Sequence, residues 1–402
     1  MNLITYAVPF FLFAIAFELL WGILRQRNTY RLNDAFSSLM LGILSQARRF
    51  VALGIGGVIY DAIIQGTGQH QWDAGAWYTW VLAFFLYDLC YYWLHRFGHE
   101  RQILWAAHVA HHQSEDYNLS TALRQTSTGF LLGWIFYLPM YLVGIPVEVV
   151  VTVGALNLIY QFWVHTQHVP ELGWFELVFV SPSNHRVHHA QNDRYMDRNY
   201  GGVFILWDRL FGTYQRELPE EPCIYGIRGP IKSWNPVIAL THIYADMLRD
   251  MRATTSWINR WNVLWARTGW QPDDVAAIAP RTKSDLAAFE RFDPQVSPLT
   301  KIYGGVQIAG ATAMLTYGQL TKLTPTAYWI WWALLVWTGV ATAWWLEGRT
   351  LTRSLTTDLP RLSLLAMFTI TTVTAPVWLT LSWMWIGASV LLLGFNVAQS
   401  RE

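Results

Sequence analysis

Residues 76–100 read AWYTWVLAFFLYDLCYYWLHRFGHE, and this stretch decides the fold. Its apolar part, Ala76–Leu94, is close to the roughly 20 residues that a helix needs to cross a membrane. His95 and His99 follow directly, and a spacing of four residues places both imidazoles on one face of a continuing helix. The stretch therefore predicts a membrane helix that ends in two candidate metal ligands.

Three more histidine clusters follow this pair. They are His108 with His111 and His112, His165 with His168, and His185 with His188 and His189. Ten of the twelve histidines thus lie in clusters, at separations typical of one helix face. A buried imidazole needs a partner for each ring nitrogen, and so many in one region can satisfy one another only through shared ions. The pattern predicts a metal centre.

The composition indicates a lipid environment. Of the 402 residues, 53% are hydrophobic and only 14% are charged, which favours an all-α, polytopic membrane protein. A net charge of +1 with no basic patch predicts no nucleic-acid partner. About nine apolar stretches are candidate transmembrane helices: Leu3–Leu24, Phe36–Ile64, Ala76–Leu94, Gly129–Ile145, Val147–Val164, Ile302–Leu320, Ala327–Leu346, Leu362–Leu379 and Trp383–Val397.

The distribution of basic residues predicts the orientation. The loop from Arg25 to Asp34 is rich in arginine, whereas Gln65–Gly75 contains neither lysine nor arginine, so the first loop is expected to be cytoplasmic and the second is not. The chain returns to the cytoplasmic side at His95 and again, after a hairpin through Pro146, at His165. All four clusters are therefore expected at the cytoplasmic face, of the plasma membrane in a bacterium or of the endoplasmic reticulum in a eukaryote.

Four parts of the chain are expected. Residues 1–75 form amino-terminal spans, 76–250 the catalytic domain, 251–301 a cytoplasmic linker and 302–402 carboxy-terminal spans. Arg48 and Arg49 either break the second stretch or point into a polar cavity. The last two stretches are short and share a turn near Ser382, which leaves a re-entrant pair open, and Arg349, Arg353 and Arg361 fall in a predicted cytoplasmic loop.

The ligand types favour iron over zinc. No cysteine accompanies the histidines, and the zinc-peptidase pattern His-Glu-x-x-His fails because Ile103 stands where the second histidine is needed. Eight or more imidazoles suffice for two ions with open positions, and imidazole suits iron, which binds dioxygen at such positions. Two irons beside apolar helices indicate oxidation of a lipid C–H bond.

The chain resembles the fatty acid hydroxylase and sterol desaturase superfamily at its eight-histidine signature: His95-x3-His99, His108-x2-His-His112 and His185-x2-His-His189. It is similar to the alkylglycerol monooxygenase branch at Ser114–Gln125, Tyr160–Thr166, Asn184–His189 and Asn199–Thr213. The resemblance implies a diiron monooxygenase that hydroxylates the ether-linked carbon of a glyceryl ether lipid, so that the product breaks into a fatty aldehyde and a glycerol derivative. It also implies tetrahydrobiopterin as the reductant, or an external electron carrier protein as in most of the superfamily.

The resemblance implies the eight signature histidines as metal ligands, and His165 is added as a ninth. Asp88, two turns before His95, and Glu100 are candidates for orienting an imidazole or delivering a proton. His168 is either a ligand or a loop residue, whereas His70 and His242 are expected to be ordinary. The candidates for contacts with the substrate or reductant, or for loop anchoring, are Asp116, Tyr117, Asn118 and Arg124.

Three other functions remain open. The same site could hydroxylate or desaturate a sterol, a fatty acid or a carotenoid. A membrane metal transporter would line a path with histidines, but here the clusters occur at the ends of spans on one predicted side. A non-enzymatic scaffold would tolerate the loss of any one cluster.

Overall fold

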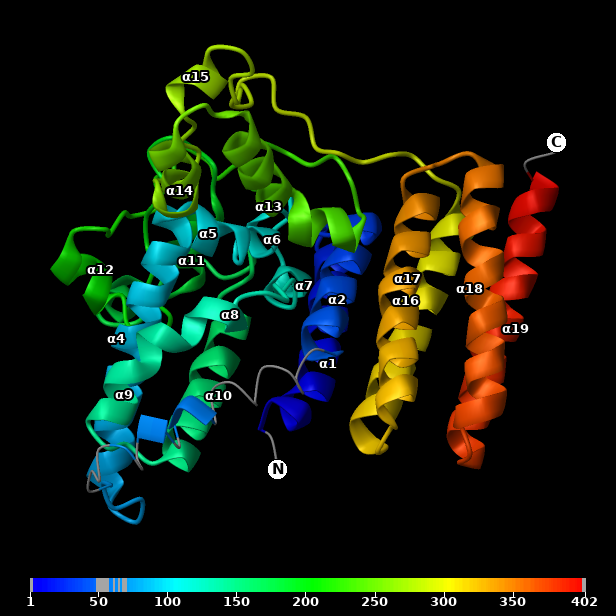
Figure 1. The fold of residues 1–402 in the computed structure, drawn as a ribbon, viewed down its shortest axis with the longest axis horizontal. Coiled ribbons are helices and arrows are strands. Elements are labelled where there is room, and N and C mark those ends of the chain that lie inside the picture. The colour runs from blue at the N-terminus through cyan, green and yellow to red at the C-terminus, as the bar shows by residue number, and fades with distance from the viewer. Residues whose placement is uncertain (1–2, 48–57, 61, 64–65, 67–70, 400–402) are drawn as a thin grey trace. The chain divides into compact units, whose positions relative to one another are not determined.

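The computed structural model describes residues 3–47, 58–60, 62–63, 66 and 71–399, and it is drawn as a ribbon in Figure 1. Regular structure in these residues is helical apart from two isolated bridges, Phe179 with Phe204 and Ala190 with Tyr225. The predicted all-α class is therefore confirmed. Arg48, Arg49 and His70 lie outside the described residues, and the expectations for them remain predictions.

The chain divides into two compact units. Unit 1 comprises Met1–Tyr30, Phe50–Pro230 and Thr241–Phe289, and unit 2 comprises Arg31–Arg49, Ile231–Leu240 and Glu290–Glu402. The helices of unit 1 are α1 (Leu3–Leu24), α4 (Trp77–Glu100), α5 (Gln102–Ala106), α6 (Val109–His112), α7 (Leu119–Ala122), α8 (Phe130–Gly133), η1 (Trp134–Tyr137), α9 (Leu138–Leu142), α10 (Val147–Trp163), η2 (Gly173–Leu177), α11 (Pro182–His189), α12 (Leu206–Phe211), α14 (Trp257–Trp265) and α15 (Asp273–Ala276). Helix α13 (Pro236–Ala253) begins in unit 2 and ends in unit 1.

Long helices hold the short ones of unit 1 in place. Helix α4 packs along α10, and α10 also contacts α1 (Figure 1). Ala83 of α4, Met140 of α9 and Val149 of α10 are buried in the core that these helices share. The end of α4 that carries His95 and His99 is continued by α5 and α6. The second histidine cluster lies at α6, with His108 as its N-cap residue.

The predicted span Gly129–Ile145 is not one helix. The chain forms α8, η1 and α9 in succession, and Pro139 stands in the first turn of α9. Proline has no N–H to continue a helical ladder, and it fits best in a first turn. The apolar composition was therefore a correct sign of a helical region but not of a continuous helix.

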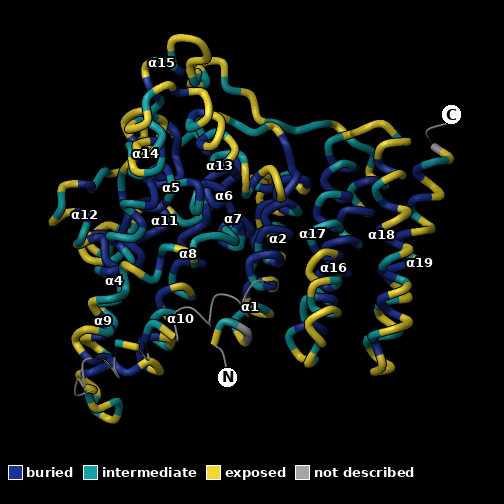
Figure 2. The backbone as a smooth tube through the Cα atoms, in the orientation of Figure 1, coloured by how far each residue is buried: buried dark blue, intermediate teal, exposed yellow. Residues whose placement is uncertain are grey.

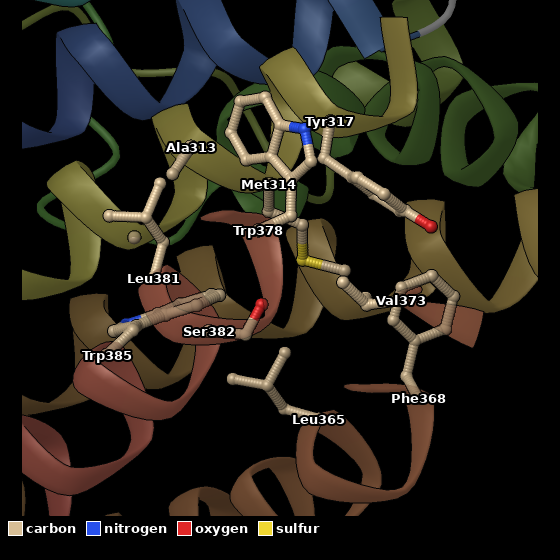
Figure 3. Close-up of a pocket in the computed structure, with 11 residues that line it drawn as sticks. Ala313, Met314, Tyr317, Leu365, Phe368, Val373, Trp378, Leu381, Ser382 and Trp385 are labelled. Atoms are coloured by element: carbon tan, nitrogen blue, oxygen red, sulfur yellow. The ribbon is translucent and has the colours of Figure 1, made fainter. Parts of the chain in front are cut away.

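Unit 2 is a bundle of long helices. It contains α2 (Leu32–Ala47), α16 (Pro298–Leu320), α17 (Pro325–Leu346), α18 (Leu351–Thr372) and α19 (Pro376–Gln399). Helix α16 contacts α2, α17 and α19, and its Tyr303 is fully buried in the core. A small, mostly apolar cavity lies among α16, α18 and α19, where Tyr317, Phe368, Trp378 and Trp385 surround it (Figure 3).

Two predictions in the carboxy-terminal part were wrong. The turn lies at residues 373–375, just before Pro376 starts α19, so Ser382 is inside a helix and the last two helices have 22 and 24 residues. Arg353 and Arg361 belong to α18 rather than to a loop. Of the arginines that suggested a loop, Arg361 is buried, and it forms an ion pair with the buried Asp358 inside the bundle.

Three helices of the described chain are long and apolar enough to cross a membrane: Tyr6–Leu24, Pro325–Leu346 and Pro376–Ala398. Figure 2 shows many exposed positions along α19, and large apolar residues such as Leu391 and Phe395 are among them. Exposed apolar faces of this length suit lipid rather than water. The chain is an integral membrane protein, and the count of nine spans and the cytoplasmic orientation of the site remain predictions.

Candidate metal centre

The nine histidines predicted as ligands lie together in two groups, and within each group one ring nitrogen of every histidine is within 4.8 Å of the others. Group A consists of His95, His99, His108, His112 and His188. Group B consists of His111, His165, His185 and His189. Among the described residues, His168 and His242 belong to neither group.

Short helices distribute the imidazoles between the groups. Helix α6 presents His112 to group A and His111 to group B, and α11 presents His188 to group A and His185 and His189 to group B. Neighbouring positions on a helix point about 100° apart, whereas positions four apart share a face. Each of these helices therefore reaches both groups.

The amino terminus of α11 is fixed by local sequence. Ser181 and Asn184 form a capping box, and Pro182 stands in the first turn. A capping box satisfies two backbone N–H groups that the first turn leaves without partners, and proline is favoured at this position. The eight-residue helix that carries three of the histidines thus begins at a defined point.

Backbone carbonyls set the tautomer of four imidazoles. The Nδ1 atoms of His95, His111, His165 and His188 lie 2.8, 2.9, 2.8 and 2.9 Å from the carbonyl oxygens of Tyr200, Arg124, Gln161 and Arg198. A carbonyl oxygen only accepts, so each Nδ1 carries the hydrogen and each Nε2 carries a lone pair. This is the orientation that metal-binding histidines commonly have.

The Nε2 atoms converge within each group, and for His111 and His165 no hydrogen lies between them. In group B, the Nε2 atoms of His111 and His165 are 3.3 Å apart, and those of His165 and His185 are 3.1 Å apart. In group A, the buried Nε2 atoms of His95, His99 and His188 have no hydrogen-bond partner. Lone pairs that face one another in a buried site need a cation between them.

Protons are poor candidates for that cation. Burial lowers the pKa of His111 to about 4 and those of His188 and His189 well below the ordinary value of 6.5. The imidazoles are therefore neutral near pH 7 and available to bind metal. The two groups fit two ions, with five and four possible nitrogen ligands, and an all-imidazole set is compatible with iron.

Comparison with known proteins gives the family. The family profile described as fatty acid hydroxylase matches residues 80–213. Alkylglycerol monooxygenase of Homo sapiens is 38% identical over 308 residues, which are 75% of this chain and 68% of that protein. The chain belongs to the fatty acid hydroxylase family. It is therefore an oxidoreductase of the iron-dependent monooxygenase type.

Two further proteins are similar to the chain. Alkylglycerol monooxygenase of Danio rerio is 38% identical over 309 residues, covering 75% of this chain and 67% of that protein. Ornithine lipid hydroxylase of Rhizobium tropici is 29% identical over 155 residues, covering 38% of this chain and 46% of that protein. No solved structure matches the chain.

In this family member, Asp88 forms no hydrogen bond with an imidazole of the described residues. Its Oδ1 accepts from Asn157 Nδ2 at 2.6 Å and from Val203 N at 2.9 Å. Its Oδ2 accepts from Phe204 N at 2.9 Å and from Trp207 Nε1 at 3.0 Å. The carboxylate thus holds the turn after Tyr200, and it reaches His95 only through that turn and the Tyr200 carbonyl.

Glu100 is paired with an arginine. Its Oε1 accepts from Arg96 Nε at 2.9 Å, one helical turn earlier, and both side chains are partly exposed. Such a pair contributes only a few tenths of a kcal/mol. Glu100 follows His99 in the sequence, but among the described residues it forms no hydrogen bond to an imidazole.

The four residues predicted to contact substrate or reductant are buried around group B and the nearby loop. Tyr117 stacks on His165 with a centroid distance of 5.7 Å, and its hydroxyl donates to Val164 O. Arg124 donates to Ala110 O at 2.7 Å, and its own carbonyl orients His111.

The other two residues form contacts within the loop. Asn118 caps α7 and donates to Thr29 O, and the Asp116 carbonyl accepts from Ser114 Oγ. These contacts favour loop anchoring for Asn118 and Arg124.

Several supporting residues could not be recognised in the sequence. Asp208 accepts hydrogen bonds from the backbone N–H groups of Tyr200 and Gly201, both at 2.7 Å, and so positions the carbonyl that orients His95. Glu18 of α1 accepts from Tyr30 Oη at 2.5 Å and from Leu119 N at 2.8 Å. The sequence shows Glu18 only as an acidic residue inside an apolar stretch, which predicts that it faces protein or the membrane interface but indicates no specific partner.

Proposed function

We propose that this chain is a membrane-bound diiron monooxygenase that hydroxylates a lipid C–H bond with O2, and that its substrate is a glyceryl ether lipid. The observation that carries the proposal is the convergence of nine imidazoles, eight of them buried, into two groups of ring nitrogens. In one of these groups the lone pairs of His111 and His165 face each other. The similarity to proteins named alkylglycerol monooxygenase over 75% of the chain supports the substrate class.

The proposed ligands are the five imidazoles of group A and the four of group B, each group holding one iron. Iron, when bound, supplies the activation of O2 and the oxidising power. The protein supplies the fixed tautomers: the carbonyls of Tyr200, Arg124, Gln161 and Arg198 keep four Nε2 atoms directed inward. These fixed tautomers would hold the Nε2 lone pairs in place for metal binding.

The reaction balances with an external reductant. One oxygen atom of O2 enters the C–H bond next to the ether oxygen, and the other leaves as water after taking up two electrons and two protons. The hydroxylated carbon is then a hemiacetal, whose C–O bond breaks to give a fatty aldehyde and a glycerol derivative. We propose tetrahydrobiopterin as the electron donor, with an external carrier protein as the second possibility.

The same proposal includes the membrane arrangement. About nine spans with the histidine groups at the cytoplasmic face would let a lipid reach the site from the bilayer while the reductant arrives from the cytoplasm. The three long apolar helices and the exposed apolar faces support membrane insertion.

The test is turnover of an alkylglycerol by membranes that contain the full chain, supplied with iron and tetrahydrobiopterin. We expect fatty aldehyde from the wild type, none above background from His188→Ala, and near wild-type amounts from His168→Ala, a matched control outside both groups. If the protein binds iron but forms no aldehyde, the proposal of an iron-dependent oxidase stands and the proposed glyceryl ether substrate is rejected. No iron and no aldehyde would reject both.

The runner-up is hydroxylation or desaturation of another lipid, such as a sterol, fatty acid or carotenoid. The similarity to an ornithine lipid hydroxylase over 38% of the chain is the observation that favours it. Comparison of lipid extracts with and without the expressed protein would separate these substrates. A metal transporter or scaffold is less well supported, because the imidazoles converge in two buried groups instead of lining a path.

A further inference from the structure

Helix α14 carries an exposed apolar surface in the segment that the sequence suggested as a linker. It reads WINRWNVLW from Trp257 to Trp265. The exposed fractions are 66% for Trp257, 71% for Ile258, 56% for Trp261 and 55% for Trp265, and Figure 2 shows exposed positions along this helix. Clustered exposed indoles suit the boundary between lipid headgroups and acyl chains, where tryptophan is enriched.

A slot between α13 and α14 adds positive charge to this surface. It is lined by Leu248, Met251, Arg252, Trp257, Arg260 and Trp261. No carboxylate lines the slot, and within the described part of the chain neither arginine forms an ion pair. The buried Nε of Arg260 has no acceptor, and its guanidinium lies 5.7 Å from the Trp257 ring centroid.

The two arginines and the apolar side chains of the slot together favour one kind of ligand. Two guanidinium groups without carboxylate partners suit a phosphate oxygen, with which arginine forms short, charge-assisted hydrogen bonds. Indole, leucine and methionine side chains around them suit the glycerol and upper acyl region of the same molecule. An acidic protein would satisfy the arginines but would not account for the exposed Ile258 and tryptophans of α14.

The slot is also linked to the metal centre. Arg101 donates to the carbonyl of Trp265 at 3.0 Å, and the Gln102 N–H donates to the carbonyl of Ala266 at 3.1 Å. Thr268 Oγ1 donates to the carbonyl of His99. The end of α14 is therefore attached to the segment that connects His99 with His108, and α14 packs on α5 within it.

We infer that the slot between α13 and α14 binds the phosphate headgroup of an anionic phospholipid, with Arg252 and Arg260 on the phosphate and the α14 tryptophans in the headgroup region. The binding site lies outside both imidazole groups and does not depend on the proposed reaction.

The experiment uses the full chain purified in a neutral detergent. Dioleoyl phosphatidylglycerol and dioleoyl phosphatidylcholine are titrated separately, and bound lipid is counted by native mass spectrometry. We expect the wild type to bind phosphatidylglycerol about tenfold more tightly, because two arginines contribute to the anionic headgroup. The double variant R252Q/R260Q should lose this preference. The control R249Q should keep it, because Arg249 lies on α13 outside the slot and pairs with Asp246.

A second measurement covers the case in which R252Q/R260Q does not fold. Phosphatidylglycerol with brominated acyl chains should quench indole emission less in W257F/W261F than in the wild type. The inference is overturned if R252Q/R260Q folds and keeps the preference, if inorganic phosphate at equal concentration displaces the lipid, or if quenching is the same in W257F/W261F. It is also overturned if the wild type shows no preference for the anionic lipid, an outcome that would favour an acidic protein as the occupant.

Discussion

The Nε2 atoms of His111 and His165 lie 3.3 Å apart, although both imidazoles donate through Nδ1 to a backbone carbonyl. Two neutral rings in this arrangement direct lone pairs at each other, and nothing but a cation can make the contact favourable. The backbone carbonyls therefore fix these two imidazoles in the tautomer that metal binding requires.

Iron content should follow the two groups. The wild type is expected to retain about two irons per chain, and His185→Ala in group B or His99→Ala in group A is expected to retain about one. Metal analysis of the purified protein measures this. Removal of the metal by a strong chelator should lower the thermal midpoint, because an ion at 100 times its Kd stabilises the fold by about 2.7 kcal/mol. Zinc in place of iron at full occupancy, in protein expressed with ample iron, would contradict the assignment of the metal.

His165 and His168 should behave differently although they are three residues apart. His165 belongs to group B, and its Nε2 lies 3.1 Å from that of His185, whereas His168 belongs to neither group. We expect His165→Ala to lose one iron and at least about 100-fold in activity, and His168→Ala to keep both. Equal effects of the two substitutions on iron content would remove His165 from the ligand set.

The sequence singled out the histidine set as candidate ligands because their spacing is local, but the expected shared face fails at a separation of three. His108 and His111, and likewise His185 and His188, belong to different groups. Positions 95 and 99, or 185 and 189, share a helix face whatever the rest of the chain does. The division into two groups was not predictable, because His111 and His112 are adjacent in sequence and only the packing of α6 sends them to different groups. The carbonyl that orients His95 belongs to Tyr200, which is 105 residues away, so the sequence around His95 does not predict this contact.

In the carboxy-terminal helices, the hydropathy pattern does not predict the helix boundaries correctly. Arg361 lowers the apolar character of its surroundings, which predicts a loop, but its ion pair with Asp358 hides both charges inside the bundle. A hydropathy pattern counts each charge separately and does not register that two charges three residues apart lie on one helix face. Pro376 begins α19, and proline's preference for the first turn was the better signal for the boundary.

Asp88→Asn should destabilise the turn that orients His95. Both oxygens of Asp88 accept hydrogen bonds, and an asparagine amide would present N–H groups to two of the donors. We expect a loss of about 2–4 kcal/mol in the free energy of unfolding, because buried donors are left without acceptors. Iron retention should fall as well. The control Glu100→Gln should change the unfolding free energy by no more than about 0.5 kcal/mol, because its pair with Arg96 is partly exposed. Equal stabilities for the two variants would show that Asp88 does not support the turn.

Acid should destabilise the metal-free protein below about pH 6.5. Burial lowers the pKa of His111 to about 4 in the folded chain, whereas an unfolded histidine has a pKa of about 6.5. Between these values the unfolded state binds more protons, so stability is lost as the pH falls from about 6.5 towards 4. His111 alone contributes about 3 kcal/mol over this window, and His188 and His189 add to it with the same sign. Thermal midpoints of the metal-free chain between pH 7.5 and 5 measure the effect, and midpoints that stay constant over this range would mean that the imidazoles are not buried and neutral.

The buried ion pair of unit 2 should behave as a coupled unit. Arg361 Nε lies 2.8 Å from Asp358 Oδ1, and Trp345 Nε1 donates to Asp358 Oδ2 at 2.7 Å, while Tyr303 Oη accepts from Arg361 Nη2 at 3.2 Å. Asp358→Asn or Arg361→Met alone leaves a buried charge without its partner, and we expect a loss of about 3–5 kcal/mol from each. The double variant should lose clearly less than the sum of the two, because it removes both charges together. Thermal or denaturant unfolding in detergent measures the three variants. Strict additivity would mean that the two charges are stabilised separately by the bundle, with Trp345 and Tyr303 as sufficient partners.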